Sequence, residues 1–441
     1  MGMSLGGLSF LSYSIYIRHV YILAHPSNST TPWIFAINGT DPTCWRPVTS
    51  TIAIASGRVE PPDKTTMFGM SLNWQIDNVT LASKRMGGVY KPVVFNSFIT
   101  LTPTDFQVDI MNWQAQQVGS VNGIFEITLQ PSVRMSLIPD ATLQAVAKQM
   151  AIMNGYYGVP VILRYGHEMN GAWMPYGQHP TEYIASFRAL ATYVHAATNM
   201  TAMMWAPNAG LYYPYGAVVN ASSPDFAVLD SNNDGAFNVL DDPYLPYFPG
   251  AGYVDWVGLS MYQYHQNSTA ASDYLNANVP VGPCFIRDYI SGTLNCQPRS
   301  SNTSNRDFYT NFAVAYNKPF ALPESGSAYA TNATNVVAQT VDEVTMKTAW
   351  WTSILTLIPG SAVNPVYPLL KLVVNFEEAK AEAETSTLWQ NRDYRISYNP
   401  SVVTSLTTSL FPPATRMLFG SQLSYQCGGQ VLVTKAGPSS S

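Results

Sequence analysis

The stretch VILRYGHEMNGAWMPYG, from Val161 to Gly177, joins an apolar run to a dense group of polar and aromatic side chains. The run Val161–Tyr165 is short and rich in branched aliphatic residues, which is typical of a buried parallel strand. His167 and Glu168 follow at the point where this strand is expected to end. In a closed parallel barrel, the residues beyond the carboxyl ends of the strands form the active-site face. Glu168 is therefore a candidate catalytic carboxylate.

A second glutamate, Glu324, stands near the end of a similar apolar run, Lys318–Ser325 (KPFALPES), and small residues follow it. Two glutamates at the ends of two strands suit a retaining glycosidase. In such an enzyme one carboxylic acid protonates the leaving oxygen, and the other, about 5 Å away, attacks the sugar carbon. A solvated or salt-bridged surface residue is the alternative for any single glutamate. The matched settings of Glu168 and Glu324 favour the catalytic interpretation.

Eight short apolar runs lie between residues 65 and 377, and polar or aromatic residues follow most of them. They are Thr66–Leu72, Val89–Phe95, Gly123–Leu129, Val161–Tyr165, Thr201–Trp205, Asp255–Ser260, Pro319–Leu322 and Leu369–Val374. Helical patterns occur between them, at Asp140–Gly155, Thr181–Ala197 and Val341–Leu357. This alternation predicts an α/β fold, a (β/α)8 TIM barrel forming a single catalytic domain. The segment from Asn208 to Val254 predicts a long insertion between strands 5 and 6.

The insertion contains DSNNDGAFNVLD, whose spacing matches a calcium-binding loop and resembles the dockerin type, which accepts Asp at its twelfth position. The predicted metal ligands are Asp230, Asn232, Asp234, Ala236 and Asp241. We expect a structural calcium ion here and no cofactor for catalysis. The alternative is a metal-free turn rich in Asp and Asn.

The composition favours a neutral, hydroxyl-rich ligand. Charged residues make up 11% of the chain and the net charge is −5, so the sequence lacks the basic surface that nucleic acid or anionic lipid requires. Aromatic and amide side chains are plentiful. The expected partner is a neutral β-linked polysaccharide, with no nucleic acid, and the expected state is a monomer.

The four cysteines predict disulfides rather than a zinc site, because no CxxC pair occurs and no histidine lies at metal spacing. Three pairings are possible, and we favour Cys284–Cys296 with Cys44–Cys427 because the first is local. Eight sequons fit a secreted glycoprotein. They are at Asn28, Asn38, Asn78, Asn199, Asn220, Asn267, Asn302 and Asn332.

The termini are expected to lie outside the catalytic domain, which we assign to residues 31–436. Residues 1–30 contain an apolar stretch interrupted by Arg18 and His19, so this segment is interpreted as signal-like or anchor-like. Residues 437–441 form a flexible tail of low complexity. The predicted location is secreted or extracellular, with anchoring at the cell surface as the alternative.

Four motifs resemble glycoside hydrolase family 26 over roughly residues 65 to 400: HEMNGAWMPYG, WAPN, VDWVGLSMY and LPESG. The resemblance implies that Glu168 is the general acid/base and Glu324 the nucleophile of a retaining enzyme. It implies an endo-β-1,4-mannanase first, a mixed-linkage β-glucanase or β-1,3-xylanase next, or a non-catalytic carbohydrate-binding barrel. Met174, Pro175 and Tyr176 depart from the Trp-rich turn of the family, and this departure leaves the substrate open.

The remaining predicted site residues surround this carboxylate pair. Arg164 is expected to keep Glu324 ionised through a charge-assisted hydrogen bond. The set expected around the substrate is Arg164, His167, Asn170, Trp173, Trp205, Asn208 and Tyr262. The three aromatic residues would be platforms for sugar rings, and the two asparagines would bond sugar hydroxyls. His167 would orient the substrate or a carboxylate, or else be a structural histidine. HExxH, GxSxG and Gly-rich phosphate motifs are absent from the sequence, which argues against other hydrolase classes.

Overall fold

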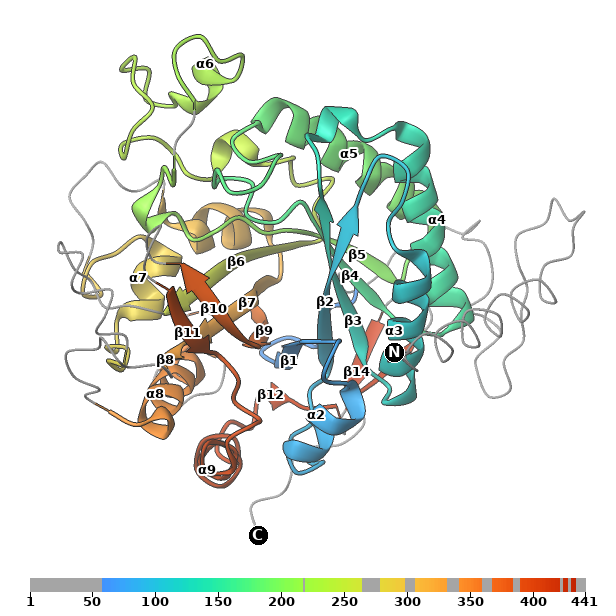
Figure 1. Ribbon diagram of the computed structural model, residues 1–441, viewed down its shortest axis with the longest axis vertical. Coiled ribbons are helices and arrows are strands. Elements are labelled where there is room, and N and C mark those ends of the chain that lie inside the picture. Colours follow the sequence, from blue (N-terminus) through green and yellow to red (C-terminus); the bar gives the residue numbers. More distant parts are fainter. Residues whose placement is uncertain are drawn as a thin grey trace, which may run out of the picture.

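The computed structural model describes residues 58–216, 219–263, 278–297, 306–330, 341–358, 367–383, 389–420, 423–426 and 430–433. Eight parallel strands form a closed barrel, because the last of them pairs with both β7 and β1 (Figure 1). They are β1 (Thr66–Leu72), β2 (Val94–Leu101), β3 (Ile124–Pro131), β4 (Val161–Tyr165), β5 (Thr201–Trp205), β6 (Trp256–Gln263), β7 (Phe320–Ser327) and β9 (Leu370–Glu377). The predicted (β/α)8 barrel is therefore confirmed.

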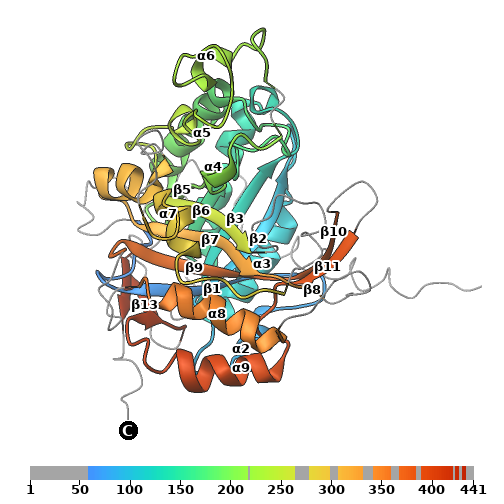
Figure 2. The same ribbon diagram turned by 90° about the vertical axis from the view of Figure 1, so that its left-hand side faces the viewer.

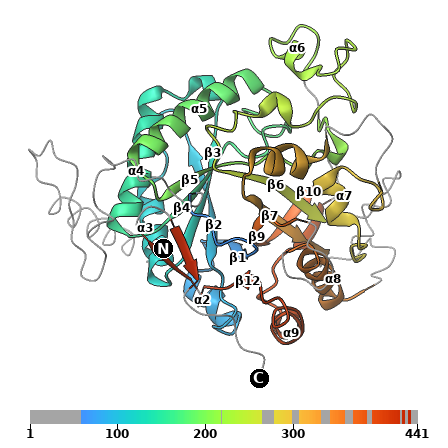
Figure 3. The same cartoon turned by 180° about the vertical axis from the view of Figure 1, so that it is seen from behind.

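Helices connect the strands and cover the outside of the barrel (Figure 3). They are α2 (Val79–Arg85), α3 (Val108–Ser120), α4 (Asp140–Tyr156), α5 (Pro180–Ala197), α6 (Phe226–Leu229), α7 (Phe285–Ser291), α8 (Glu343–Leu355) and α9 (Pro400–Ser405). Three of them, α4, α5 and α8, were predicted from the sequence, and their observed ends differ from the predicted ends by at most two residues. Side-chain caps explain two starts, since Asn78 accepts a hydrogen bond from Leu81 N at α2 and Asp342 accepts one from Thr345 N at α8.

Most strand positions agree with the sequence prediction, but the second strand was placed wrongly. It was expected at Val89–Phe95, whereas β2 begins at Val94 and continues to Leu101. Pro92 has no N–H for a ladder, so the apolar residues before Val94 lead into the strand instead. The strand continues through the polar residues Asn96 and Ser97 because both are buried and hydrogen-bonded to neighbouring elements.

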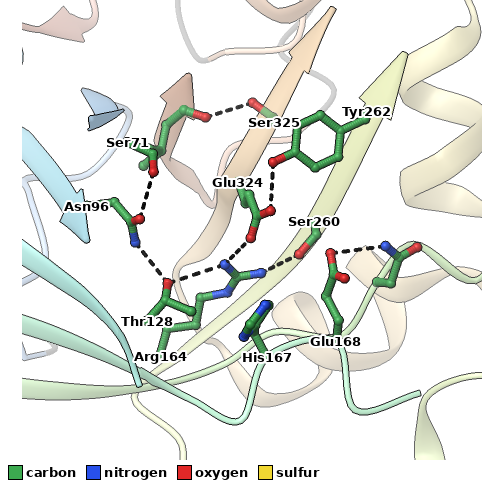
Figure 4. Close-up of polar contacts among 12 residues, drawn as sticks. Ser71, Asn96, Thr128, Arg164, His167, Glu168, Ser260, Tyr262, Glu324 and Ser325 are labelled. Carbon is green, nitrogen blue, oxygen red and sulfur yellow. Dashed lines mark hydrogen bonds and ion pairs between the residues drawn. The ribbon is translucent and has the colours of Figure 1, made fainter. Parts of the chain in front are cut away.

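The barrel divides the apolar side chains into two sets, one inside the barrel and one between strands and helices. Alternation along each strand decides the set: on β5, Met204 belongs to the small inner cluster, and its neighbours Met203 and Trp205 belong to the large outer cluster. Polar side chains occupy the interior above the inner cluster. Figure 4 shows several of them converging near the carboxyl ends of the strands.

The connection between β5 and β6 is long, as predicted. Its described part contains only the four-residue α6 and the 3-10 turns η3 (Gly210–Tyr212) and η4 (Leu245–Tyr247). Figures 1 and 2 show the region around α6 extending away from the barrel.

Short strands add to the barrel on the carboxyl side of β7 and β9. β8 (Tyr329–Ala330), β10 (Ala379–Ala383) and β11 (Trp389–Asp393) form a three-stranded antiparallel sheet (Figure 2). Because β8 and β10 each begin two residues after a barrel strand ends, this sheet continues the barrel wall. β12 (Met417–Leu418) pairs with β1, and β13 (Leu423–Gln426) forms a hairpin with β14 (Gln430–Val433).

The local disulfide Cys284–Cys296 is confirmed, with Cα atoms 5.2 Å apart. The second predicted pair, Cys44–Cys427, lies outside the described residues, as do residues 1–30 and 437–441. Within the described part of the chain, no helix combines the length and the hydropathy needed to span a bilayer.

Candidate active site

The turn after β4 holds Glu168 in an unusual backbone conformation. Gly166 has φ +59°, and a Cβ atom at this position would lie 2.2 Å from Met135 Cε. Glu168 has φ 53°, in the left-handed region that residues with side chains rarely occupy. Its N–H donates to Ala206 O over 3.0 Å, which ties the turn to the end of β5. The backbone conformation of the turn, as well as the side-chain rotamer, therefore determines the direction of the Glu168 carboxyl group.

Two side-chain donors hold the carboxylate of Glu168. Trp173 Nε1 donates to Oε2 at 2.9 Å, and Asn208 Nδ2 donates to Oε1 at 3.1 Å. The Trp173 ring is 47% exposed, and it packs so close to Gly171 that a Cβ there would lie 2.2 Å from the ring. Trp173 thus lies at the site, as predicted. One face of its ring is open to a ligand, and its N–H donates to Glu168.

Asn170 does not face the substrate space, so its predicted role as a partner for sugar hydroxyls is wrong. Its side chain is fully buried and forms a reciprocal pair with the backbone of Asn208. Asn170 Nδ2 donates to Asn208 O at 2.8 Å, and Asn208 N donates to Asn170 Oδ1 at 2.9 Å. The amide of Asn170 therefore fixes Asn208, which in turn donates to Glu168.

Glu324 lies within β7, where its carboxylate accepts two hydrogen bonds (Figure 4). Arg164 Nη1 donates to Oε2 at 2.5 Å, and Tyr262 OH donates to Oε1 at 2.7 Å. Arg164 also donates to Ser260. The predicted ion pair between Arg164 and Glu324 is present. Arg164 itself is fully buried, so it serves the carboxylate and does not contact a substrate.

Tyr262 reaches the site as a hydrogen-bond donor rather than as the predicted flat sugar platform. Its ring makes edge contacts with Phe376 and Tyr394, with centroids 5.6 and 5.2 Å away. Those contacts fix the ring so that its hydroxyl meets Glu324.

A chain of buried polar side chains supports Arg164 from three further strands (Figure 4). Ser71 Oγ donates to Asn96 Oδ1 at 2.9 Å, and Asn96 Nδ2 donates to Thr128 Oγ1 at 2.9 Å. Thr128 Oγ1 also accepts a longer bond from Arg164 Nη1 at 3.4 Å. The chain links β1, β2 and β3 to the guanidinium, so its position depends on residues far apart in the sequence.

The two glutamates have pKa values displaced in opposite directions. Burial, and after it the negative charge of Glu324, raise the pKa of Glu168 above its ordinary value. Burial alone would also raise the pKa of Glu324, but the charge and the hydrogen bond of Arg164 outweigh it and lower that pKa. Such a pair keeps one carboxylic acid and one carboxylate at the same pH, which is the division of roles that general acid and nucleophile require.

His167 is buried and uncharged. Burial, followed by the charge of Arg164, lowers its pKa to about 3. Its Nδ1 lies 3.3 Å from the hydroxyl of Tyr176, and Phe98 makes an edge contact with its ring at 5.6 Å between centroids. Only 3% of His167 is exposed, which favours the structural interpretation over substrate contact.

Trp205 is absent from the site, and its prediction as a sugar platform is wrong. It is fully buried between the barrel and the outer segments, stacked on Phe308 with centroids 5.5 Å apart. Its position on β5 explains this, because Met204 and Ala206 face the barrel interior and the residue between them must face outward.

Sequence reasoning missed the buried polar residues inside the barrel. Thr128, Ser260 and Glu126 are fully buried on strands that were recognised as apolar runs. The available signal was a polar residue at alternate positions, as in IFEITLQP on β3, which indicates an interior face that is not wholly apolar.

The predicted calcium loop forms a closed turn held by its own side chains. Asp230 accepts hydrogen bonds from Asp234 N at 3.0 Å and Gly235 N at 2.8 Å, and Gly235 has φ +84°. Asp241 accepts from Ser231 N at 2.8 Å and Asn238 N at 2.7 Å. In the described residues, no group of three or more His, Cys, Asp and Glu side chains has the arrangement of a metal site.

The closed parallel barrel carries two carboxyl groups near its carboxyl end, one with a raised and one with a lowered pKa, and this arrangement suits a glycoside hydrolase. The chain also carries a family signature: residues 43–220 match the family model of glycosyl hydrolase family 26. The resemblance to glycoside hydrolase family 26 that the motifs predicted is thereby confirmed.

Comparison with individual proteins gives only distant likenesses. Among curated proteins, no sequence matches this chain. An endo-β-1,4-mannanase double mutant from Cellulomonas fimi is 16% identical, with 86% of this chain and 75% of that chain covered and a TM-score of 0.47. The catalytic domain of a family 26 endo-β-1,4-mannanase from Bacillus sp. JAMB-750 is 14% identical, with coverages of 83% and 94% and a TM-score of 0.46. A fungal β-1,4-galactanase is 13% identical, with coverages of 78% and 100% and a TM-score of 0.46.

The hydrogen bond from Trp173 to Glu168 gives a first testable prediction. Replacing Trp173 by Phe removes a donor that favours the ionised form, so the pKa of Glu168 rises further. If Glu168 is a general acid, as the resemblance implies, it must be protonated to act. The alkaline limb of kcat/KM should then move up by about one pH unit, the value of one hydrogen bond to a charged group. Trp113→Phe on α3 is the matched control, because Trp113 packs against Trp74 instead. An equal displacement in both variants would contradict the assignment.

Proposed function

We propose that this chain is a retaining endo-β-glycosidase of a neutral β-linked polysaccharide, with β-1,4-mannan as the first candidate substrate. The observation that carries the proposal is the opposite displacement of the pKa values of Glu168 and Glu324 at one site. A retaining mechanism needs one group that arrives protonated and one that arrives ionised.

In the first step Glu168 donates its proton to the glycosidic oxygen while Glu324 Oε attacks the anomeric carbon. The bond between that carbon and the leaving oxygen breaks, the leaving sugar departs as an alcohol, and a glycosyl ester forms on Glu324. In the second step Glu168, now a carboxylate, takes a proton from water. The water oxygen attacks the anomeric carbon, and the ester bond breaks to restore Glu324.

Two further contacts support these roles. Tyr262 and Arg164 each donate to Glu324, so they stabilise the carboxylate before attack and again when it leaves. Asn208 donates to Glu168 and would stabilise the carboxylate that forms when Glu168 gives up its proton.

The displaced pKa values imply a bell-shaped dependence of kcat/KM on pH. Activity falls as the pH rises through the raised pKa of Glu168, because the acid is lost. It also falls as the pH decreases through the lowered pKa of Glu324, because the nucleophile becomes protonated. The plateau should therefore extend on both sides of the ordinary glutamate pKa.

The choice of polymer rests on the family resemblance and on the surface beside Glu168. Trp173 presents an exposed ring there, with Tyr215 5.6 Å away between centroids, and aromatic faces of this kind bind the apolar faces of sugar rings. Mannan is the first candidate because it is the commonest substrate in the resembling family. Mixed-linkage β-glucan and β-1,3-xylan follow.

The test is to incubate the purified chain with mannan, mixed-linkage glucan, β-1,3-xylan, β-1,4-galactan and chitosan, and to follow the released anomer by proton NMR. Early appearance of the β-anomer from one polymer would support a retaining β-glycosidase and identify its substrate. Early appearance of the α-anomer would overturn the retaining mechanism. Binding of an oligosaccharide with no cleavage of any polymer would support a non-catalytic carbohydrate-binding barrel instead.

We also propose that the loop from Asp230 to Asp241 binds a structural calcium ion. Ligand spacing supports this, together with the sharp turn at Gly235. Removing calcium with EGTA should lower the melting temperature by about 3 °C, since a ligand bound only by the folded state stabilises it. Asp234→Ala should abolish the calcium response, whereas Asp109→Ala on α3 should keep it. A melting temperature that does not respond to EGTA in the unmodified protein would refute the calcium site.

Secretion is a further proposal, supported by the disulfide Cys284–Cys296, since disulfides persist in oxidising compartments. Recovery of the oxidised protein from the culture medium would support it, and retention of the reduced protein inside the cell would contradict it.

A further inference from the structure

A third glutamate lies inside the barrel, where the reaction described above does not use it. Glu126 is on β3, fully buried, with its neighbours in register at Asn96 on β2 and Ile162 on β4. It is two residues from Thr128, which bonds Arg164, so both side chains belong to the interior face of the strand. Among the described residues neither carboxyl oxygen of Glu126 has a partner at full hydrogen-bond geometry, although the Asn96 amide acts on it as a donor and lowers its pKa.

The charged groups around Glu126 are those of the catalytic site. Arg164 on β4 and Glu324 on β7 both act on it electrostatically, and the facing side chain on β2, Asn96, does not titrate. Arg164 donates through Nη1 and Nη2, while its Nε has no acceptor within the described structure. Arg164 is therefore a buried cation near two glutamates. It contacts Glu324 but does not contact Glu126.

Burial favours the uncharged form of Glu126. It raises the pKa of this group to about 8, with the positive charge of Arg164 opposing the rise and the negative charge of Glu324 adding to it. Below about pH 8 Glu126 is thus a neutral acid beside an ionised Glu324. In that range Glu126 does not compete with Glu324 for Arg164.

We propose that Glu126 is a positioning residue: in its uncharged form it leaves the guanidinium of Arg164 to Glu324, and its ionisation at alkaline pH withdraws that support and disables the site. The proposal rests on the proposed function, because it assigns Glu324 the role of nucleophile.

The physical reason is competition for one cation. An ionised Glu126 would have the Asn96 amide as a donor but no cation in contact with it, and a buried carboxylate without a charge partner is strongly unfavourable. Arg164 is the cation that acts on Glu126, and its Nε–H has no acceptor within the described structure. Engaging that N–H would turn the guanidinium away from Glu324 and Ser260. The nucleophile would then lose both its alignment and its charge partner.

The first experiment tests the protonation state without using activity. The melting temperatures of the unmodified protein and of Glu126→Gln are compared by calorimetry from pH 5 to pH 8. An unfolded glutamate loses its proton near pH 4.3, about as in model peptides, so in this range unfolding of the unmodified protein releases a proton from Glu126. Through this proton, rising pH destabilises the unmodified protein. The melting temperature of Glu126→Gln should therefore increase relative to that of the unmodified protein as the pH rises.

The second experiment tests the link to the nucleophile through the pH profile of kcat/KM. At a pH above the pKa values of both Glu168 and Glu126, the unmodified enzyme should lose activity about a hundredfold per pH unit, whereas Glu126→Gln should lose about tenfold. On the acid side the variant should remain active, with kcat/KM lowered by less than roughly tenfold. If Glu126→Gln does not fold, Glu126→Met replaces it, since an unbranched apolar side chain of similar length needs no partner.

Two results of these experiments would overturn the proposal. A melting-temperature difference that stays constant from pH 5 to pH 8 would show that Glu126 is not a neutral acid in the fold, and would overturn the proposal. A melting-temperature difference that changes with pH, combined with identical alkaline limbs of kcat/KM in the two proteins, would also overturn it. Ionisation of Glu126 would then have no effect on the nucleophile. The calorimetric result does not depend on any substrate, so it stands even if the proposed glycosidase activity fails.

Discussion

Replacing Glu324 by Gln is expected to lower kcat on the preferred polymer by about 10⁵-fold, because the proposed nucleophile of the covalent intermediate is lost. The glutamine keeps the volume of Glu324 and one acceptor oxygen, so the barrel should still fold. Its unfolding free energy should fall by about 3 kcal/mol, since the buried guanidinium of Arg164 loses its charge partner. Turnover is measured by reducing-end release, and stability by urea denaturation.

The matched control for this variant is Glu182→Gln. Glu182 also pairs with an arginine, Arg134, but on the exposed surface of α5. The control should keep full turnover and lose no more than about 1 kcal/mol, as surface ion pairs usually contribute. Azide should partly restore turnover of an aryl glycoside by Glu324→Ala and give the glycosyl azide of inverted configuration. Normal polymer turnover by Glu324→Gln would refute the mechanism.

Replacing Glu168 by Gln is expected to slow cleavage of the polymer by about 10³-fold to 10⁴-fold, the usual contribution of a general acid. An aryl glycoside with a strongly acidic phenol as leaving group needs little protonation, so formation of its glycosyl-enzyme should be much less affected. The second step still lacks its base, and the intermediate should accumulate as a burst of released phenol. Stopped-flow absorbance measures the burst and its amplitude.

The pH dependence provides an independent check on Glu168. Its raised pKa sets the alkaline loss of the acid form, so Glu168→Gln should remove that contribution from the alkaline limb measured with the aryl glycoside. Glu182→Gln again serves as the control, with an unchanged profile. If Glu168→Gln slows polymer and aryl glycoside to the same degree and shows no burst, Glu168 is not the general acid.

The position of the two glutamates was predictable because it depends on local patterns. β4 and β5 have the predicted bounds, and Glu168 follows β4 where an apolar run gives way to polar residues. For Glu324 the expected strand stopped at Leu322, yet β7 continues through Ser327 with a register irregularity against β9 between Leu322 and Ser325. The glutamate was correctly associated with strand 7, although it lies inside that strand.

The orientation of individual side chains was much less predictable. Trp205 and Asn170 both stand in motifs close to the carboxylates, yet Trp205 faces the outer core and Asn170 bonds the backbone of Asn208. Chemical type and proximity in sequence suggested sugar contacts for both. The face of a strand and the path of the neighbouring turn decided otherwise.

Local alternation of apolar and polar residues was enough to establish the order of strands and helices, because each element needs a face or stripe to bury. The same patterns established that two glutamates accompany strands 4 and 7. Only the folded barrel decided which of the polar residues meet: Arg164 reaches Glu324, 160 positions away, and Ser71, Asn96 and Thr128 join it from three other strands. Closure of the barrel sets the relative register of distant strands, and no local pattern encodes that register.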